Sequence, residues 1–300
     1  MVSGASTTWN YAKTGMLMAA LTAVLILLGG LIGGSTGLIL MALFAVVFNF
    51  VMYWKSGPMA LKMSRAVAVT PEQAPELHAM VDRLAARAGV PKPGVYVTPD
   101  QQANAFACGR NPANAAIAVT EGIQYQLSAR ELEGVVAHEM AHIKNRDILI
   151  ASVAAMAAGA IAAIANWLQF SLIFGGGDDE GGLGLIGTLA AMIIAPIAAT
   201  MIQLAISRGR EYEADRTGAE LMGEAEPLAS ALAKLQAGAE RVPMDPNPAT
   251  AQMYIVNPFA SFHGRGITKM FSTHPPMDER IRRLRDLEPV IAAQPQEARA

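Results

Sequence analysis

The sequence predicts a mostly helical α+β fold that is partly embedded in a membrane. It also predicts a small β-sheet beside a helix that carries the pentapeptide His138-Glu139-Met140-Ala141-His142. The membrane part is predicted by composition, because 52% of the 300 residues are hydrophobic, only 16% are charged, and the mean hydropathy is +0.30. This composition is too apolar and too poor in charge for an ordinary soluble domain.

Four hydrophobic segments account for the apolar composition. Residues 14–54 contain no charged residue and no histidine, and they are long enough for two spanning helices of ~20 residues with a turn at residues 33–37. A second apolar run follows the first directly, which favours a membrane anchor over a cleaved signal peptide. Two more uncharged runs cover residues 148–177 and 183–207. For this second pair, a buried helical hairpin in a water-soluble fold remains the alternative, because both runs are rich in Ala and Gly.

Each of the four hydrophobic segments has Lys or Arg near the end that adjoins a long polar region or a terminus of the chain. These residues precede the first and third segments and follow the second and fourth. The two loops on the other side carry no Lys or Arg, and the second of them is acidic. The positive-inside rule therefore places both termini and the polar regions in the cytoplasm. A single cysteine fits a reducing compartment, and a pI near 6.2 gives no sign of nucleic-acid binding. The flanking basic residues are Lys13, Lys55, Lys62, Arg65, Lys144, Arg146, Arg208 and Arg210.

Between the first two hydrophobic pairs the sequence predicts a helix and a small sheet. Residues 70–73 form a capping-box pattern with Pro at the first helical position, so a helix is expected to start there and to end at Gly89. Short β-prone runs follow at residues 94–97, 104–107 and 115–119. Such a sheet could take an extended peptide as an added strand, bound through main-chain hydrogen bonds.

A second capping box, at residues 128–131, predicts that the pentapeptide lies in the middle of a helix. After the fourth hydrophobic segment, a helix is expected to end at Gly223, with a short helix at 226–237 and a basic helix at 277–288 after it. Residues 289–300 are expected to be disordered. The predicted division is an anchor at 1–55, a first catalytic part at 56–147, a second hydrophobic pair at 148–207 and a second catalytic part at 208–300.

The pentapeptide is the HExxH pattern of catalytic zinc sites. On a helix, His138 and His142 lie on one face with a rise of ~6 Å between them, a separation that tetrahedral zinc can use. Glu139 can then act as the general base that takes a proton from water. The alternative is a chance match on an amphipathic helix.

A catalytic zinc needs a third protein ligand, and Glu211 is the best candidate. Asp215 lies four residues later on the same helix face and can, as a supporting carboxylate, orient a ligand or bind a nearby cation. His142 precedes the third segment by ~9 Å of helix and Glu211 follows the fourth by ~6 Å. If both segments span the membrane, the two heights match and the metal is expected within ~10 Å of the membrane surface. An exposed charged helix is the alternative. His274, before two prolines, is a candidate donor to the reaction's oxyanion, or an ordinary turn residue.

Taken together, four motifs resemble the HtpX family of bacterial membrane zinc endopeptidases, which are related to the CAAX prenyl proteases. The motifs are residues 138–147, 207–215, 104–107 and 273–276. The resemblance implies a zincin-type catalytic domain of the gluzincin class with one Zn²⁺ per subunit. It also implies that His138, His142 and Glu211 bind the zinc and that Glu139 is the general base.

The same resemblance implies further site residues and a setting. Asn104, Ala105 and Phe106 would lie along the cleft and bind substrate, His274 would lie near the reaction centre, and Arg280 would pair with Asp215. The expected location is the bacterial inner membrane, multi-pass, with the catalytic site on the cytoplasmic side. The expected partners are the lipid bilayer and misfolded or damaged membrane proteins under stress, with no nucleic acid.

Two other functions compete with this one. An intramembrane protease of the site-2 type also carries HExxH, but inside a spanning helix. Charged residues on both sides of the motif argue against burial in lipid. The other is a membrane scaffold that binds zinc but hydrolyses no substrate. In such a protein Glu139 would have no catalytic role. The charged residues are Arg130, Glu131 and Glu133 before the motif and Lys144, Arg146 and Asp147 after it.

Overall fold

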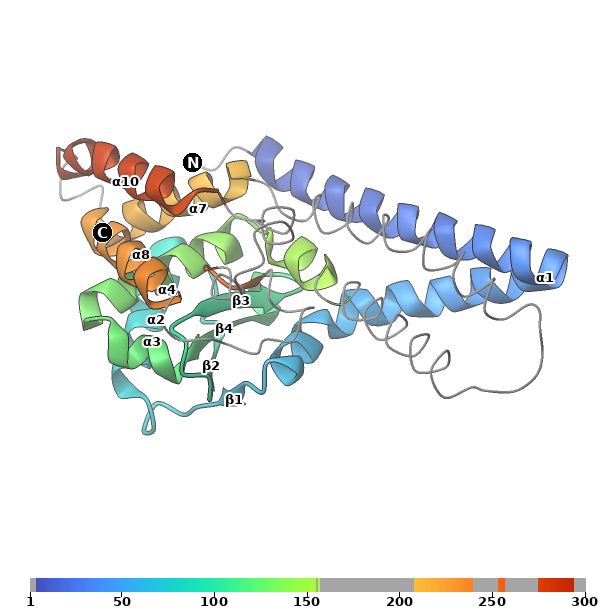
Figure 1. The fold of residues 1–300 in the computed structure, drawn as a ribbon, viewed down its shortest axis with the longest axis horizontal. Coiled ribbons are helices and arrows are strands. Elements are labelled where there is room, and N and C mark those ends of the chain that lie inside the picture. Colours follow the sequence, from blue (N-terminus) through green and yellow to red (C-terminus); the bar gives the residue numbers. More distant parts are fainter. Residues whose placement is uncertain (1–3, 155, 157–207, 240–252, 257–274, 294–300) are drawn as a thin grey trace.

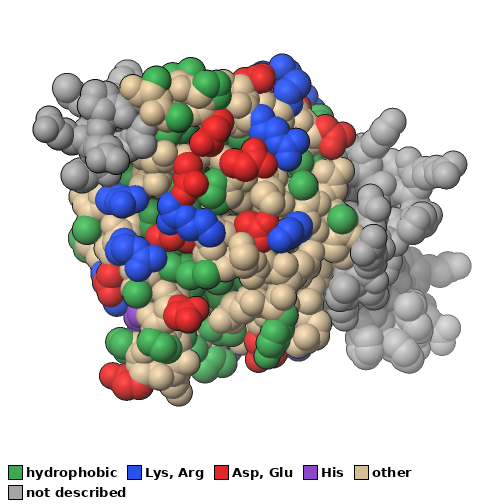
Figure 2. Space-filling view, turned by 90° about the vertical axis from the view of Figure 1, so that its left-hand side faces the viewer, with side chains coloured by type: hydrophobic (Ala, Val, Ile, Leu, Met, Phe, Trp, Pro, Cys, Tyr) green, Lys and Arg blue, Asp and Glu red, His purple; other side chains and the backbone are tan. Residues whose placement is uncertain are grey.

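The computed structural model describes residues 4–154, 156, 208–239, 253–256 and 275–293. These residues form the mostly helical α+β fold that the sequence predicts, with one small mixed sheet. One long helical hairpin, α1, projects from the part that contains the sheet and the other helices (Figure 1). The opposite end of the molecule presents basic and acidic side chains side by side (Figure 2), so the apolar and charged surfaces lie at opposite ends.

Helix α1, Gly4–Met63, reverses direction within its length. Gly34 has a φ of +58°, which glycine adopts without steric cost, and the two arms then run side by side (Figure 1). Between the arms, Asn49 Nδ2 donates to Thr22 Oγ1 over 2.6 Å. The predicted turn at residues 33–37 is confirmed. The large hydrophobic side chains of the second arm are mainly exposed, among them Phe44 and Phe50, which are 51% and 64% exposed.

The second arm, Gly34–Met63, is long and apolar enough to cross a membrane, and it is the one such helix in the described part of the chain. The first arm contains a shorter apolar stretch, Thr14–Leu27. Most of the third predicted segment and all of the fourth lie outside the described residues. Four spanning helices therefore stay a prediction.

The sheet has the strand order β1-β2-β4-β3 and contains all three predicted strands. β2 and β4 are parallel, whereas β3 pairs antiparallel with β4, with Phe106 opposite Ala118. β1 adds two exposed residues at the other edge, too few to give a sequence pattern. The strands are β1 Val67–Ala68, β2 Gly94–Thr98, β3 Ala105–Gly109 and β4 Ala115–Thr120.

Helix α4, Ala129–Lys144, is the centre of the helical part and packs against α2, α7, α8 and β3 (Figure 1). It starts at the predicted capping box, in which Ser128 Oγ accepts from the Glu131 N–H and the Glu131 carboxylate accepts from the Ser128 N–H. The same carboxylate accepts from Ser230 and Lys234 of α8, which joins the two helices. The other helices are α2 Pro75–Ala88, α3 Glu121–Gln126, α7 Arg208–Met222, α8 Glu226–Ala239 and α10 Met277–Ala292, with a 3₁₀ turn at Pro112–Asn114.

Two predicted helix boundaries are wrong, and a proline explains each. α2 begins at Pro75 and not at residue 71, because a proline restricts the residue before it, and Ala74 has the non-helical angles φ −139° and ψ 64°. α10 continues through Pro289, although proline lacks the N–H for an intrahelical bond. The helix continues because Ile291, which is 1% exposed, packs in the same hydrophobic core as the rest of the helix.

Candidate metal centre

Two helices bring three potential metal ligands together. His138 and His142 of α4 face Glu211 of α7, and one donor atom from each lies within 4.8 Å of the others. The two Nε2 atoms are 3.1 Å apart, and each lies 3.7 Å from an oxygen of Glu211. The helices approach closely because Gly218 of α7 has no side chain: a Cβ there would lie 3.0 Å from the backbone nitrogen of His138.

The outer nitrogen of each histidine is held by a carboxylate. His142 Nδ1 lies 3.1 Å from both oxygens of Asp147, and His138 Nδ1 lies 3.0 Å from Asp215 Oδ1. An Nδ1–H that donates to a carboxylate leaves the Nε2 lone pair for a metal. Asp147 reaches back to His142 because the chain turns sharply at Arg146, whose φ is +59°.

Sequence reasoning did not assign this role to Asp147, which it used only as a charged flank of the motif. A carboxylate just past the end of the motif's helix was the one available signal. Its position depends on the left-handed turn at Arg146, and a non-glycine residue gives no sequence cue for such a turn.

Arg280 of α10 lies behind the histidines and is completely buried. Its Nε and Nη2 donate to the two oxygens of Asp215 over 2.8 and 2.7 Å, the pairing that the resemblance implies. Burial opposes the charge of Asp215, but Arg280 outweighs it and lowers the pKa of this carboxyl to about 2. Arg280 Nη1 also lies 3.8 Å from Glu211 Oε2, so a fixed positive charge borders the ligand cluster.

Glu139 lies between the two histidines in sequence and is 3% exposed. Burial raises the pKa of its carboxyl to about 7, and the nearby Glu211 also raises it, although the charge of His142 acts in the opposite direction. The backbone N–H of Ala107, on β3, donates to this carboxylate. Glu139 is therefore fixed between α4 and the edge of the sheet.

The donor set fits a divalent metal ion such as zinc. Two imidazole nitrogens and one carboxylate oxygen are the ligands of many catalytic zinc sites, whose tetrahedral donors lie roughly 3.3 Å apart. The observed separations of 3.1 and 3.7 Å bracket that value. Burial lowers the pKa of His142, but the negative charges of Asp147 and Glu211 outweigh it and raise the pKa to about 10, whereas burial lowers the pKa of His138. The field at the cluster is thus one that attracts a cation.

Of the other predicted site residues, the structure describes Asn104, Ala105 and Phe106 but not His274. The Asn104 side chain and the Ala105 carbonyl bond to residues 255–256 of the chain itself, and the Phe106 ring packs edge-on against Tyr254 at 5.3 Å. Their predicted role in substrate binding stays a prediction. His274 lies outside the described residues.

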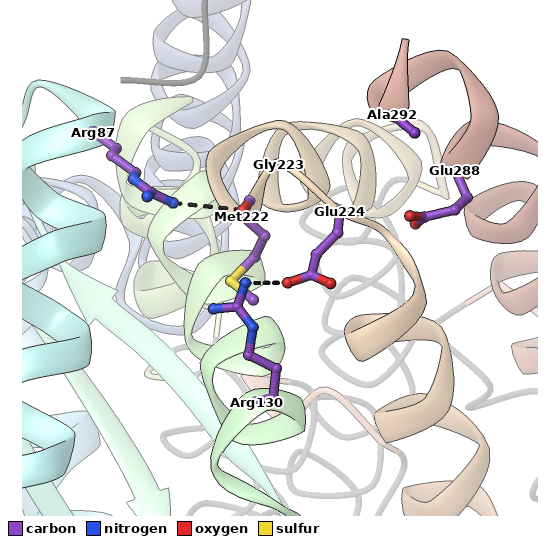
Figure 3. A pocket seen from close by; sticks show the side chains of 7 residues that line it. All are labelled: Arg87, Arg130, Met222, Gly223, Glu224, Glu288 and Ala292. Carbon is purple, nitrogen blue, oxygen red and sulfur yellow. Dashed lines mark hydrogen bonds and ion pairs between the residues drawn. The ribbon is translucent and has the colours of Figure 1, made fainter. Parts of the chain in front are cut away.

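A cavity of about 390 Å³ lies at the N-terminal end of α4, roughly 12 Å of helix from His138 (Figure 3). Its charged groups already have protein partners. Arg87 donates to the carbonyls that end α7, Arg130 pairs with Glu224, and Glu288 accepts from the backbone N–H groups that start α8. The cavity is therefore a junction between helices and is separate from the metal centre.

The fold and the ligand cluster together define a peptidase of the HExxH class, and comparisons with known proteins agree. The model of peptidase family M48 matches residues 71–288. Proteins described as "Protease HtpX homolog" from Desulfatibacillum aliphaticivorans and Persephonella marina are 50% and 52% identical over 289 and 280 residues. These alignments cover 95% and 92% of this chain and 92% and 96% of the relatives.

The chain therefore belongs to peptidase family M48, among the HtpX proteases, which confirms the resemblance drawn from its motifs. A solved structure, the crystal structure of S. mikatae Ste24p, is 19% identical, with a TM-score of 0.48. That alignment covers 92% of this chain and 64% of the other.

Proposed function

We propose that this chain is a membrane-bound zinc metalloendopeptidase that hydrolyses peptide bonds of membrane or membrane-proximal proteins. One observation carries the proposal: His138, His142 and Glu211 converge from two helices while Glu139 lies beside them on the inner face of α4. A structural ion pair would not need two histidines with facing Nε2 atoms and a carboxylate behind each ring.

The described residues divide the reaction between them. His138, His142 and Glu211 would hold the zinc ion, which when bound supplies Lewis-acid activation of the scissile carbonyl and of water. Glu139 takes a proton from the attacking water on its carboxylate as the carbon–oxygen bond forms. It then delivers that proton to the leaving nitrogen as the carbon–nitrogen bond breaks. Before metal binds, burial raises the pKa of the Glu139 carboxyl, which makes its carboxylate a stronger base than an exposed one.

Three residues keep this machinery in position. Asp147 and Asp215 orient the two imidazole rings, and Arg280 fixes Asp215. His274 is the proposed donor to the oxyanion, on the strength of the sequence motif that it shares with the family.

The proposed setting is the bacterial inner membrane, with the catalytic part on the cytoplasmic side. The exposed apolar second arm of α1 supports the membrane attachment, and the basic residues at its catalytic end, Lys55, Lys62 and Arg65, support the orientation. Trp54 and Arg110 form a cation–π pair at the same end, with Arg110 Cζ 4.3 Å from the ring centre, as residues at a headgroup boundary do. Damaged membrane proteins are the proposed substrates, as the resemblance to the HtpX family implies.

The packing of α4 disfavours the two competing functions. A site-2 type protease needs its HExxH helix in lipid, but α4 is enclosed by α2, α7, α8 and β3, and Glu131 and Glu133 on it are ion-paired. A scaffold without activity gives no reason for Glu139 to be buried and held by a backbone N–H next to the ligands.

The test is metal removal and addition. Full-length protein purified in detergent and stripped by a chelator should lose cleavage of casein, and added Zn²⁺ should restore it. Glu139→Gln should bind zinc as the wild type does and lose hydrolysis by a factor of at least about 10². Zinc content and cleavage are measured on the same samples. Normal cleavage by Glu139→Gln would remove Glu139 from the mechanism, and no recovery with zinc would refute the proposed function.

Orientation is tested separately with a cysteine introduced at Lys144. Cys108, the chain's own cysteine, is buried, so the introduced thiol reports alone. It should react with a membrane-impermeant reagent in inverted membrane vesicles. Protection in inverted vesicles with reaction in right-side-out vesicles would reverse the orientation, and protection in both would favour burial of the site in lipid.

A further inference from the structure

The second arm of α1 continues beyond its apolar stretch into the part of the molecule that contains the sheet. The uncharged residues 34–54 are followed by Lys55, and the helix goes on to Met63. This continuation contacts β3 and β4 (Figure 1). Ala60, within it, is completely buried in a hydrophobic cluster with residues of both strands. One helix therefore belongs both to the proposed membrane part and to the frame of the site.

Gly57 brings α1 into direct contact with the end of β3. A Cβ on Gly57 would lie 3.0 Å from the Gly109 Cα. Pro58, which lacks an N–H and can bend a helix, follows this contact, so a bend there leaves the path from the membrane arm to β3 intact. β3 in turn holds the catalytic base, because the Ala107 N–H donates to the Glu139 carboxylate.

A second element at the proposed membrane boundary holds one of the metal ligands. Residues 148–154 are helical, and they begin the third predicted hydrophobic segment. Asp147, directly before them, has both carboxylate oxygens 3.1 Å from His142 Nδ1. The orientation of the His142 ring therefore depends on the position of this second helix.

The two elements also contact each other. Met52 of α1 is 3% exposed and lies in one hydrophobic cluster with Leu149 and Ile150. Ser152 is completely buried, and its Oγ accepts from the Gly109 N–H over 3.1 Å, which connects the second helix to β3 as well. The catalytic base and one metal ligand are thus held by two helices that meet at the proposed membrane boundary. The angle between these helices sets how the two groups lie relative to each other.

We propose that α1 and residues 148–154 transmit the state of the bilayer to the metal centre, so that turnover depends on the thickness of the hydrocarbon core. Gly57 and Ser152 are the positioning residues of this path. The inference rests on the proposed peptidase function and membrane setting, and it adds a means of regulation to them. A peptidase controlled in this way responds to a change in the membrane itself as well as to its substrate.

The expected size of the effect follows from the length of the membrane arm. Residues 34–54 form ~31 Å of helix, which matches a hydrocarbon core of ~30 Å at a tilt of ~18° and a core of ~27 Å at ~31°. Gly57 lies ~4.5 Å of helix beyond Trp54, so a change of ~13° moves it by ~1 Å relative to a partner that does not tilt with it. A misplacement of ~1 Å can cost up to 10²-fold in rate, and because the bilayer absorbs part of the mismatch we expect a change of about threefold to tenfold.

The test uses the zinc-loaded full-length protein in phosphatidylcholine nanodiscs, whose acyl chains vary the hydrocarbon thickness from about 27 to about 33 Å. The substrate is a water-soluble casein peptide, so that the substrate's own position in the bilayer plays no part. Zinc content is measured in each sample, and kcat is expressed per bound zinc. We expect kcat to vary by at least about threefold across the series while KM stays within about twofold. A smaller variation in kcat, or one confined to KM, would overturn the proposal.

Ser152→Ala tests the path between the two helices and the sheet. The variant removes the hydrogen bond from the second helix to β3, and the variation of kcat with thickness should decrease to less than about twofold. The matched control is Ser230→Ala, which removes a hydroxyl bond to Glu131 near the start of α4 and should keep the wild-type dependence. A Ser152→Ala protein with the wild-type dependence would contradict the proposed path.

Gly57→Ala replaces Ser152→Ala if that protein does not fold. The added Cβ, 3.0 Å from the Gly109 Cα, should push α1 away from β3 and shift the thickness at which kcat is highest. An unchanged optimum would likewise count against the path.

Failure of the proposed function gives a different result from failure of this inference. Without peptidase activity, the casein peptide stays intact at every thickness, even with zinc. If only the inference is wrong, the peptide is cleaved with a kcat that does not follow the thickness of the bilayer.

Discussion

Replacing Arg280 by Met should separate the stability of the core from the affinity for zinc. Arg280 is 0% exposed and forms two hydrogen bonds with Asp215, which is itself 4% exposed. Removing one partner of a buried pair costs about 3–5 kcal/mol, because the other charge is left without compensation. For a domain of this size each kcal/mol corresponds to about 2–4 °C in Tm. The expected decrease in Tm is therefore about 6–20 °C.

The matched control is Arg282→Met, the same chemical change on the same helix. Arg282 is 63% exposed and pairs with Glu279 and Asp286 at the surface. Exposed ion pairs contribute about 1 kcal/mol or less, so this variant should lose at most a few degrees. Tm is measured by differential scanning fluorimetry after zinc has been removed, so that metal binding does not contribute. Equal shifts in Arg280→Met and Arg282→Met would refute the reasoning.

A double variant, Asp215→Leu with Arg280→Met, completes the argument. Apolar side chains can replace a buried ion pair with little loss of stability, so most of the decrease in Tm should be recovered. The affinity for zinc should not recover, because His138 Nδ1 has lost the carboxylate 3.0 Å away, and such partners contribute about 10–100-fold. Competition with a chromophoric chelator measures the affinity. A double variant with wild-type zinc affinity would show that Asp215 does not act on the ligand.

Gly218→Ala should weaken zinc binding by about tenfold, because the new Cβ would lie 3.0 Å from the backbone nitrogen of His138 and push α7, which carries Glu211, away from α4. Gly134→Ala is its control, since that Cβ would meet the backbone of α8 at 2.9 Å, and equal zinc affinities in the two variants would contradict the expectation. In protein stripped of zinc, the proton on His142, whose pKa is about 10, competes with the metal. The affinity should therefore rise about tenfold from pH 7 to pH 8, and a rise below threefold in the chelator competition would show that His142 is already deprotonated.

The local signals in the sequence predicted most of the helical frame. The capping box at Ser128 and the turn near Gly34 depend on residues within a few positions of each other, and both occur as expected. Glu211 was found because the HExxH pattern requires a third donor and the chain offers few carboxylates next to an apolar segment. The start of α2 was placed four residues too early because the capping-box pattern at residues 70–73 was taken as the start, whereas Pro75 keeps Ala74 in a non-helical conformation.

Contacts between distant parts of the chain were beyond sequence reasoning. The bond from Ile255 to Ala105 joins residues 150 positions apart, and neither residue carries a polar side chain that could announce it. The role of Asp147 depends on a left-handed turn at a non-glycine residue. The pairing of Arg280 with Asp215 was predicted only through the family resemblance. The sequence pattern by itself predicts that an arginine on a basic helix lies at the surface.

The charge balance around the cluster explains why these residues belong together in a buried site. The carboxylates exceed the guanidinium groups by two, so the described surroundings carry a net charge near −2 when the histidines are neutral. A divalent cation removes that excess, and so would protons, which is the direction of the raised pKa values of His142 and Glu139. Metal and protons therefore compete for one negative field. The carboxylates behind the histidines thus contribute to metal affinity through their charge as well as through orientation. The groups counted are Glu139, Asp147, Glu211, Asp215, Arg210 and Arg280.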